Sequence, residues 1–156
     1  MAEIRFYHLT RYRLEEALTR LLRRVLERQD RAVIMASTSE RVEALNAHLW
    51  TYDPASFLPH GSAKDGHAAE QPIYLTAQLE NPNGAKLLML CDGAPAPATE
   101  ALGALGYELV CELFNGHDDE AVAEARTHWR LYREAGHKIA YFQQNDEGGW
   151  VDKTQA

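Results

Sequence analysis

The sequence is poor in cysteine: only Cys91 and Cys111 occur, and they form neither a CxxC pair nor a dense framework. It also lacks an apolar segment of signal-peptide type and any run of about twenty apolar residues, the length that a membrane helix needs. These absences exclude a small disulfide-stapled domain and a membrane span. We therefore expect a reduced, soluble, cytoplasmic protein.

The signatures of nucleotide binding are missing as well. No GxGxxG follows the first strand-like segment, residues 3–9, and no GxxxxGK[ST] occurs anywhere in the chain. Asp92 ends the apolar run "LLMLCD", but without a phosphate loop it is better interpreted as a turn or capping residue. The segment "GSAKDG" (61–66) lacks the preceding strand and the following helix of a phosphate loop. We expect no nucleotide site and no cofactor.

No catalytic or metal-binding constellation stands out. The seven histidines show no HExxH spacing, the serines lack a nucleophile-elbow context, and nothing beside either cysteine would lower the pKa of its thiol. The run "HDDE" (117–120) opens a predicted helix, where acidic side chains favour the positive end of the helix dipole. We interpret it as N-terminal capping, and we expect no metal site and a protein that is not itself an enzyme.

What the sequence does contain is an alternation of strand-like and helix-like segments. With 156 residues and 46% hydrophobic content, it is long enough for one domain with a core and too short for two. Ser37 and Glu40 have the spacing of a capping box before a helix that runs to about Trp50. Other helices are predicted within 11–30, at 98–106 and in a last long helix that "HDDE" opens. Strands are predicted at 3–9, 31–36, 72–77, 86–92, 107–114 and 138–142.

This order predicts an α/β fold in which helices cover both faces of a mostly parallel sheet, in three layers. Residues 51–72 form a long connection punctuated by proline and glycine, and such connections in compact domains are functional more often than idle. We expect a single domain over residues 1–142. Residues 143–156 are expected to be a polar C-terminal tail that is frayed apart from Trp150.

The last long helix carries a feature that the charge of the chain does not predict. The formal net charge is −7 and the pI is near 5.5, which argues against wholesale binding to nucleic acid. Yet "EARTHWRLYREAGHK" (124–138) combines three arginines with two large aromatic residues. At 100° per residue, one face carries Ala125, Trp129, Tyr132 and Gly136. The adjacent stripe is basic and consists of Arg126, Arg130 and Arg133.

The pattern alone permits two interpretations. The commoner one is an aromatic core stripe beside a solvated basic face, and this is how we interpret the arginines among residues 20–28, which oppose a leucine face. The sharper one is a site for a carboxylate-bearing ligand with an apolar end. Arginine grips a carboxylate bidentately, and each charge-assisted bond contributes about 1.5 to 3 kcal/mol. A short acidic peptide that ends in a large apolar residue would fit.

Three segments carry a resemblance to a known family: "FYHL" in the first strand, "ALNAHLWTYDPASFLPH" after the second, and "ARTHWRLYREAG" in the last helix. With these motifs the chain resembles the chi subunit family of the bacterial DNA polymerase III holoenzyme, over nearly its whole length up to about Phe142. The resemblance implies a Rossmann-like fold without a nucleotide site. It also implies a non-catalytic adaptor in DNA replication, which links the clamp loader to single-stranded-DNA-binding protein (SSB).

In this family the adaptor holds the acidic, Pro-Phe-ended C-terminal tail of SSB. Arg126 matches the family's arginine for the tail, Trp129 an aromatic and Arg130 a basic position. Arg133 also matches the pattern, and Trp50 matches the tryptophan of the "LW" motif. Val122 is a departure, because some relatives have a lysine there, so tail binding is expected either to be weaker or to lean more on the other arginines.

The resemblance also implies docking on the clamp loader through a small partner called psi, in bacteria that have one. We expect psi to contact Phe57, Leu58 and Pro59 in the long connection. An apolar pair on an exposed loop could plug a groove of a partner, or it could pack down as a lid on the chain's own core.

Two alternatives to the adaptor remain open at this point. A nucleotide-dependent enzyme with an altered phosphate loop would be stabilised by a nucleotide or dinucleotide. A direct single-stranded-DNA-binding module would use the arginines and Trp129 on bare oligonucleotide, and its affinity would fall steeply with salt.

Overall fold

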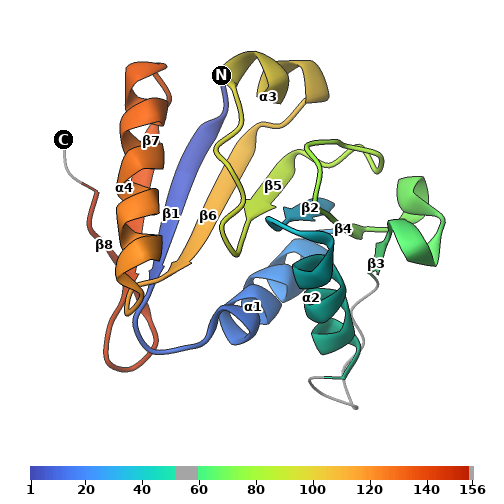
Figure 1. Ribbon diagram of the computed structural model, residues 1–156, viewed down its shortest axis with the longest axis horizontal. Coiled ribbons are helices and arrows are strands. Elements are labelled where there is room, and N and C mark those ends of the chain that lie inside the picture. Colours follow the sequence, from blue (N-terminus) through green and yellow to red (C-terminus); the bar gives the residue numbers. More distant parts are fainter. Residues whose placement is uncertain (52–59, 155–156) are drawn as a thin grey trace.

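The computed structural model describes residues 1–51 and 60–154. Within these residues, eight strands and four α-helices follow one another, together with two short 3-10 helices (Figure 1). The strands are β1 Glu3–Leu9, β2 Ala32–Met35, β3 Gly61–Ser62, β4 Ile73–Thr76, β5 Leu87–Leu90, β6 Leu109–Asn115, β7 Ile139–Gln144 and β8 Trp150–Asp152. The helices are α1 Leu14–Glu27, α2 Ser39–Thr51, η1 Ala63–Asp65, η2 Ala68–Glu70, α3 Thr99–Leu105 and α4 Asp119–Glu134.

The strands form one sheet in the order β3-β4-β2-β5-β6-β1-β7-β8. All neighbouring strands in it are parallel except β7 and β8, which are antiparallel. The prediction of a mostly parallel sheet is confirmed. β1 lies between β6 and β7, with Ile4 opposite both Val110 and Ile139. The first strand of the chain therefore supports the segments that come before and after α4.

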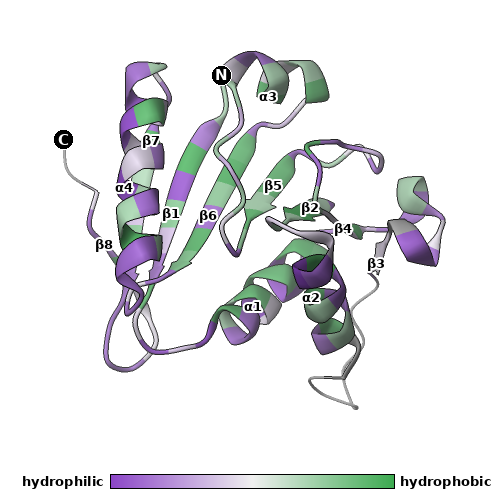
Figure 2. Cartoon of the chain, viewed as in Figure 1, coloured by the Kyte–Doolittle hydropathy of each residue, from purple (hydrophilic) through white to green (hydrophobic). Residues whose placement is uncertain are grey.

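Alternating side chains of the strands build two separate cores, one on each face of the sheet. Ile34 of β2 points into a first core with α1 and α2, where Leu22 and Leu45 are buried. The neighbouring Val33 points into a second core with α3 and α4, where Leu102 and Tyr132 are buried. Strands with two buried faces must be hydrophobic throughout, as β2 and β5 are (Figure 2). The predicted covering of both faces is confirmed.

The helix ends follow local side-chain chemistry. α1 buries the predicted leucine face, and α3 ends at Gly106, whose φ of +81° suits glycine. α2 begins differently from the prediction: the cap is Thr38, whose hydroxyl accepts the N–H of Arg41 at 3.2 Å, and Ser37 lies outside the helix. Both hydroxyl residues precede the helix, and the cap goes to the one whose oxygen reaches the free N–H groups of the first turn.

The C-terminal segment is part of the sheet, so the expectation of a frayed tail, which excepted Trp150, is wrong for Val151 and Asp152. β7 and β8 form a hairpin in which Phe142 lies opposite Asp152. The side chain of Asn145 shapes the turn by accepting the N–H groups of Glu147 and Gly149. The Trp150 ring packs edge-on against Tyr7, with 5.0 Å between ring centroids. Polar composition misled the prediction, because the strand has few apolar residues of its own and is held by its partner strand.

Gln144 locks this hairpin to the segment that follows β1. Its side-chain oxygen accepts the backbone N–H groups of Thr10, Arg11 and Tyr12 at 3.0 to 3.2 Å, and its side chain is buried. The Thr10 hydroxyl donates a hydrogen bond to the backbone carbonyl of Gln144 at 2.8 Å. One amide oxygen thus satisfies three donors that would otherwise need water.

Replacing Gln144 by alanine is therefore expected to lower the free energy of unfolding by about 1 to 3 kcal/mol, because three partly buried backbone donors lose their acceptor. Urea denaturation followed by circular dichroism measures this difference. Gln143→Ala is the matched control, since the half-buried Gln143 makes no such side-chain bonds to the described residues. Equal stability of the two variants would contradict the role given to Gln144.

Candidate functional site

Helix α4 is fixed on the second face of the sheet with its basic stripe outward. The Asp118 side chain caps it by accepting the N–H groups of Glu120 and Ala121, as predicted for "HDDE". The inward face buries Ala125, His128 and Tyr132. The helical period leaves the three arginines of the stripe exposed, and Trp129, next to them, is half-buried.

A cavity of about 620 Å³ lies between α4 and the β7–β8 hairpin, and we call it the basic groove. One wall is α4, with Val122, Trp129 and the arginines, and the opposite wall comes from the hairpin and the residues just after it. The lining residues are His8, Phe114, Val122, Ala125, Arg126, Trp129, Arg130, Arg133, His137, Ile139, Tyr141, Lys153 and Thr154. Four cations and no carboxylate are among them, beside aromatic and aliphatic side chains.

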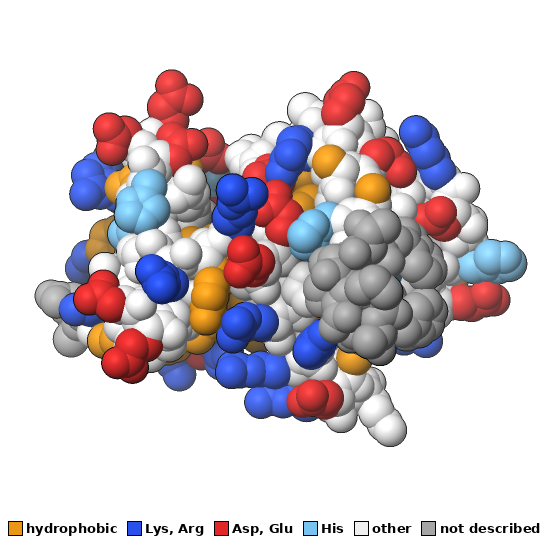
Figure 3. All heavy atoms as spheres, turned by 90° about the horizontal axis from the view of Figure 1, so that it is seen from below, with side chains coloured by type: hydrophobic (Ala, Val, Ile, Leu, Met, Phe, Trp, Pro, Cys, Tyr) orange, Lys and Arg blue, Asp and Glu red, His pale blue; other side chains and the backbone are white. Residues whose placement is uncertain are grey.

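The cations of the basic groove are available to a ligand. Within residues 1–51 and 60–154, none of Arg126, Arg130, Arg133 and Lys153 forms an ion pair with a carboxylate. The guanidinium of Arg133 lies over the Trp129 ring, 5.0 Å from its centroid, which holds it beside the apolar wall. The net charge of −7 therefore does not describe the surface locally, and in Figure 3 lysine and arginine side chains gather beside acidic ones.

Tyr141 and His8 form a hydrogen-bonded pair in the groove. The Tyr141 hydroxyl lies 2.6 Å from Nδ1 of His8. Burial, helped by the positive charges of His117 and Arg126, lowers the pKa of His8, so the ring is neutral near pH 7. Burial raises the pKa of Tyr141 by more than the positive charge of Arg126 lowers it. The Tyr141 hydroxyl therefore keeps its proton. The tyrosine therefore donates to a neutral histidine, and neither group adds a negative charge to the groove.

A buried charged pair ties α4 to the sheet beneath the groove. Nδ1 of His128 lies 2.7 Å from a carboxylate oxygen of Glu112 in β6, and both side chains are only 9% exposed. Nε2 of the same ring is 3.6 Å from Glu124, one turn earlier in α4. Burial by itself lowers the pKa of His128, but the hydrogen bond to Glu112 and the two negative charges outweigh burial and raise it.

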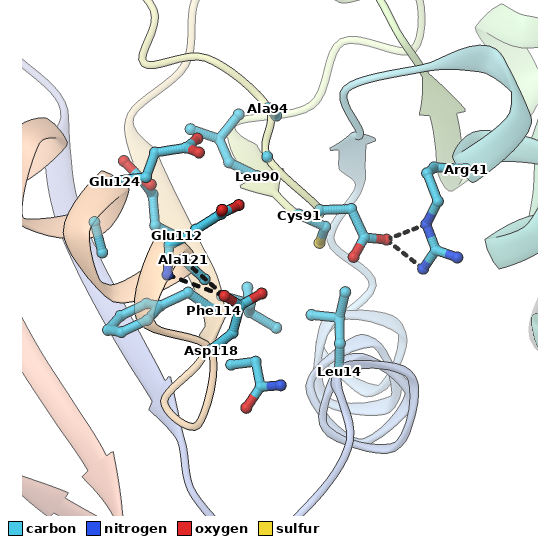
Figure 4. Close-up of a pocket in the computed structure, with 16 residues that line it drawn as sticks. Leu14, Arg41, Leu90, Cys91, Ala94, Glu112, Phe114, Asp118, Ala121 and Glu124 are labelled. Atoms are coloured by element: carbon cyan, nitrogen blue, oxygen red, sulfur yellow. Dashed lines mark hydrogen bonds and ion pairs between the residues drawn. The ribbon is translucent and has the colours of Figure 1, made fainter.

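A second cavity, of about 360 Å³, lies on the other side of α4, and we call it the acidic crevice (Figure 4). It opens at the carboxyl ends of β5 and β6, where α/β sheets commonly bind nucleotides. Its carboxylates belong to Asp92, Glu112, Asp118, Glu120 and Glu124. Its one cation, Arg41, is paired with Asp92 at 2.6 Å. A crevice with this charge repels phosphate groups.

Neither a metal site nor a membrane span is found in the described part of the chain. No group of three or more histidine, cysteine, aspartate or glutamate side chains there is arranged to hold a metal ion. No helix among these residues combines the length and apolar character needed to cross a bilayer.

The structure brings together five of the residues singled out in the sequence. Val122, Arg126, Trp129, Arg130 and Arg133 all line the basic groove. Trp50 lies near the end of α2, which packs on the other face of the sheet, and its side chain is outside the described residues. Phe57, Leu58 and Pro59 also lie outside them. Their roles stay predictions.

The sequence analysis missed the wall of the groove that faces α4. Ile139 and Tyr141 come from β7, and Lys153 and Thr154 directly follow β8. A signal was present, because Gly148-Gly149 lies between two aromatic, strand-like segments, which is typical of a hairpin. His8 and Phe114 had no such signal, since only the pairing of β1 with β6 places them side by side, with 4.9 Å between ring centroids.

The fold and the groove together define a class of α/β protein. It has an open cationic groove on one side of a helix, and this groove is separate from the acidic crevice at the strand ends. The chain belongs to the family described as DNA polymerase III chi subunit, HolC, which matches residues 1–140. A curated relative, the probable DNA polymerase III subunit chi of Rickettsia prowazekii (strain Madrid E), is 37% identical over 90 residues. That match covers 58% of this chain and 54% of the relative, so the chain spans about half of the relative's length. The family predicted from the motifs is confirmed.

The His128–Glu112 pair predicts a pH-dependent stability. Because the pKa of His128 is raised on folding, the pair stabilises the protein fully below the unfolded value of about 6.5, and this contribution is lost as pH rises through the folded pKa. His128→Gln is expected to cost about 1.5 to 3 kcal/mol at pH 6 and less at pH 9. Urea denaturation at the two pH values measures it. His67→Gln, at an exposed histidine, is the control, and a loss for His128→Gln that is equal at both pH values would contradict the pairing.

Proposed function

We propose that this chain is a non-catalytic accessory subunit of DNA polymerase III that holds the acidic, Pro-Phe-ended C-terminal tail of SSB in the basic groove. The observation that carries the proposal is the set of unpaired cations around an open cavity with an aromatic wall. Membership of the chi subunit family supports it independently of the geometry. The protein would thereby link the clamp loader to single-stranded DNA coated with SSB during DNA replication.

The groove offers both kinds of contact that such a tail needs. The carboxylates of the tail would pair with Arg126, Arg130 and Arg133, which are exposed and line the groove. The terminal phenylalanine ring would lie against Trp129 and Ile139, which are only partly buried by the chain's own core. Two charge-assisted bonds of about 1.5 to 3 kcal/mol each and one buried ring are enough for micromolar binding.

Val122 changes the balance of these contacts. It lines the groove as a half-buried side chain, so it adds apolar surface at a position where some relatives have lysine. The loss of that charge makes the tail depend more on Arg126, Arg130 and Arg133. Trp50 belongs to the tail site only through the family resemblance.

The link to the clamp loader is the other half of the adaptor. We assign it to Phe57, Leu58 and Pro59 of the long connection, and we assign the tail to the basic groove. The two partners would then use different residues of the chain. Psi is the proposed partner at this end in bacteria that have it.

The acidic crevice weakens the alternative of a nucleotide-dependent enzyme. Phosphate groups at the strand ends would meet the carboxylates of Asp118 and Glu120 at the start of α4, where phosphate loops present backbone N–H groups. The alternative of direct single-stranded-DNA binding uses the same basic groove as the tail. It is separated by experiment, because binding to nucleic acid releases counterions and falls steeply with salt.

Arg126→Ala is expected to weaken binding of a nine-residue acidic peptide ending in Pro-Phe by about tenfold or more, since one charged bond is lost. Isothermal titration calorimetry measures the affinity. Arg24→Ala is the matched control: it removes the same charge from a helix, α1, on the opposite face of the sheet. A peptide without its final phenylalanine is expected to bind far more weakly to the wild-type protein.

Unchanged affinity of Arg126→Ala for the tail peptide would reject this site. Tight, strongly salt-dependent binding of a bare oligonucleotide together with no binding of the peptide would favour the direct DNA-binding alternative. Thermal stabilisation by ATP, GTP, NAD or FAD would favour the enzyme.

Replacing both Phe57 and Leu58 by serine is expected to abolish co-purification with psi or the clamp loader of the same bacterium, because the apolar contact is lost. Affinity for the tail peptide should stay within about twofold of wild type, because the tail is assigned to the basic groove and not to this segment. Retained co-purification would reject the docking segment. Loss of peptide binding as well would show that Phe57 and Leu58 pack on the chain's own core.

A further inference from the structure

The wall of the basic groove that faces α4 includes residues beyond the family match, which ends at residue 140. We propose that the residues of this wall contact the ligand together with those of α4. Lys153 is then a specificity-determining residue, which selects acidic ligands by holding a carboxylate across the groove from Arg126. This inference rests on the proposed function of the groove. It adds a contact from a residue that lies outside the part of the chain matched to the family.

Backbone bonds fix the position of Lys153. Its N–H donates to the carbonyl of Tyr141 at 2.7 Å, and the N–H of Tyr141 donates to the Thr154 hydroxyl at 2.9 Å. The N–H of Thr154 donates in turn to Asp152 at 2.8 Å. Lys153 is thus placed beside Tyr141 in the groove, and its flexible side chain starts from a fixed point.

Tyr141 is the point of reference for the positions of Lys153 and Arg126 in the groove. Arg126 lines the same cavity as Tyr141 and His8, and its charge acts to lower the pKa of both groups. Lys153 is bonded to the backbone of the same Tyr141 on the hairpin side. A carboxylate that lies over Tyr141 therefore meets a cation from each wall, and the neutral His8–Tyr141 pair adds no repulsion.

The Thr154 hydroxyl adds a neutral donor at the same place. It accepts the N–H of Tyr141 and keeps its own proton, which it can donate to a carboxylate oxygen. Asp152, which precedes Lys153, accepts a hydrogen bond from the N–H of Thr154, and its hydrogen bonds with Thr154 lower its pKa. Lys153 itself has no acidic partner within the described part of the chain.

The hairpin is stiff enough to act as a wall. Gln144 bonds its first strand to residues 10–12, and Trp150 anchors its second strand on Tyr7. A wall that is already ordered does not have to be fixed when the ligand binds, so less of each contact is lost to ordering. Val122 leaves α4 without one of the charges found in some relatives, and Lys153 supplies a charge from the other side.

The test compares charge variants of Lys153 on the full chain. Lys153→Met is expected to weaken binding of the acidic Pro-Phe peptide about two- to fivefold, as an exposed ion pair does, and Lys153→Glu more than fivefold because it adds repulsion. Lys64→Glu is the charge-matched control, since Lys64 is exposed in η1 beside β3, at the other edge of the sheet. A peptide with its aspartates replaced by asparagine should bind equally to wild type and Lys153→Met.

The outcomes separate this inference from the proposed function. If the wild-type protein does not bind the peptide, the proposed function fails. If wild type binds, Arg126→Ala weakens binding and Lys153→Glu does not, then the role of Lys153 alone is wrong. If Lys153→Glu and Lys64→Glu weaken peptide binding equally, the effect comes from the net charge of the protein and not from the position of Lys153. This result would also overturn the inference.

Discussion

The contact between His128 and Glu112 decides how the functional face of this protein is presented. It is a buried hydrogen bond that joins the middle of α4 to β6, and removing His128 would leave the Glu112 carboxylate without this partner inside the fold. With His128 turned toward the sheet, the helical period turns the arginines of α4 away from it. The basic groove exists because this one helix face is fixed.

The same helix separates two cavities of opposite charge. Glu120 and Glu124 face the acidic crevice, and Arg126 and Arg130 face the basic groove. An anionic peptide that approaches α4 is repelled on one side and attracted on the other, so the electrostatic field contributes to the choice of site. The acidic overall charge of the chain is compatible with an anionic ligand, because the acidic and basic side chains of α4 lie on different sides of this helix.

The local patterns of the sequence predicted a large part of this arrangement. The leucine face of α1, the apolar strands β2, β4 and β5, and the capping of α4 by Asp118 all follow from periods and caps that act over a few residues. The arginine stripe was also visible. Thr38 as the cap of α2 and the strand β8 were missed, since neighbouring hydroxyls give the same signal and a polar edge strand depends on its partner.

By itself, the sequence determined the class of fold, the family and the α4 side of the groove, because each depends on patterns of residues that lie close together in the sequence. Only the tertiary structure decided that α4 lies opposite a hairpin, that His8 and Tyr141 meet between them, and that Lys153 joins the arginines. These residues are more than a hundred positions apart in the case of His8 and Tyr141. The pairing of β7 with β1 brings them together, and no local pattern encodes that pairing.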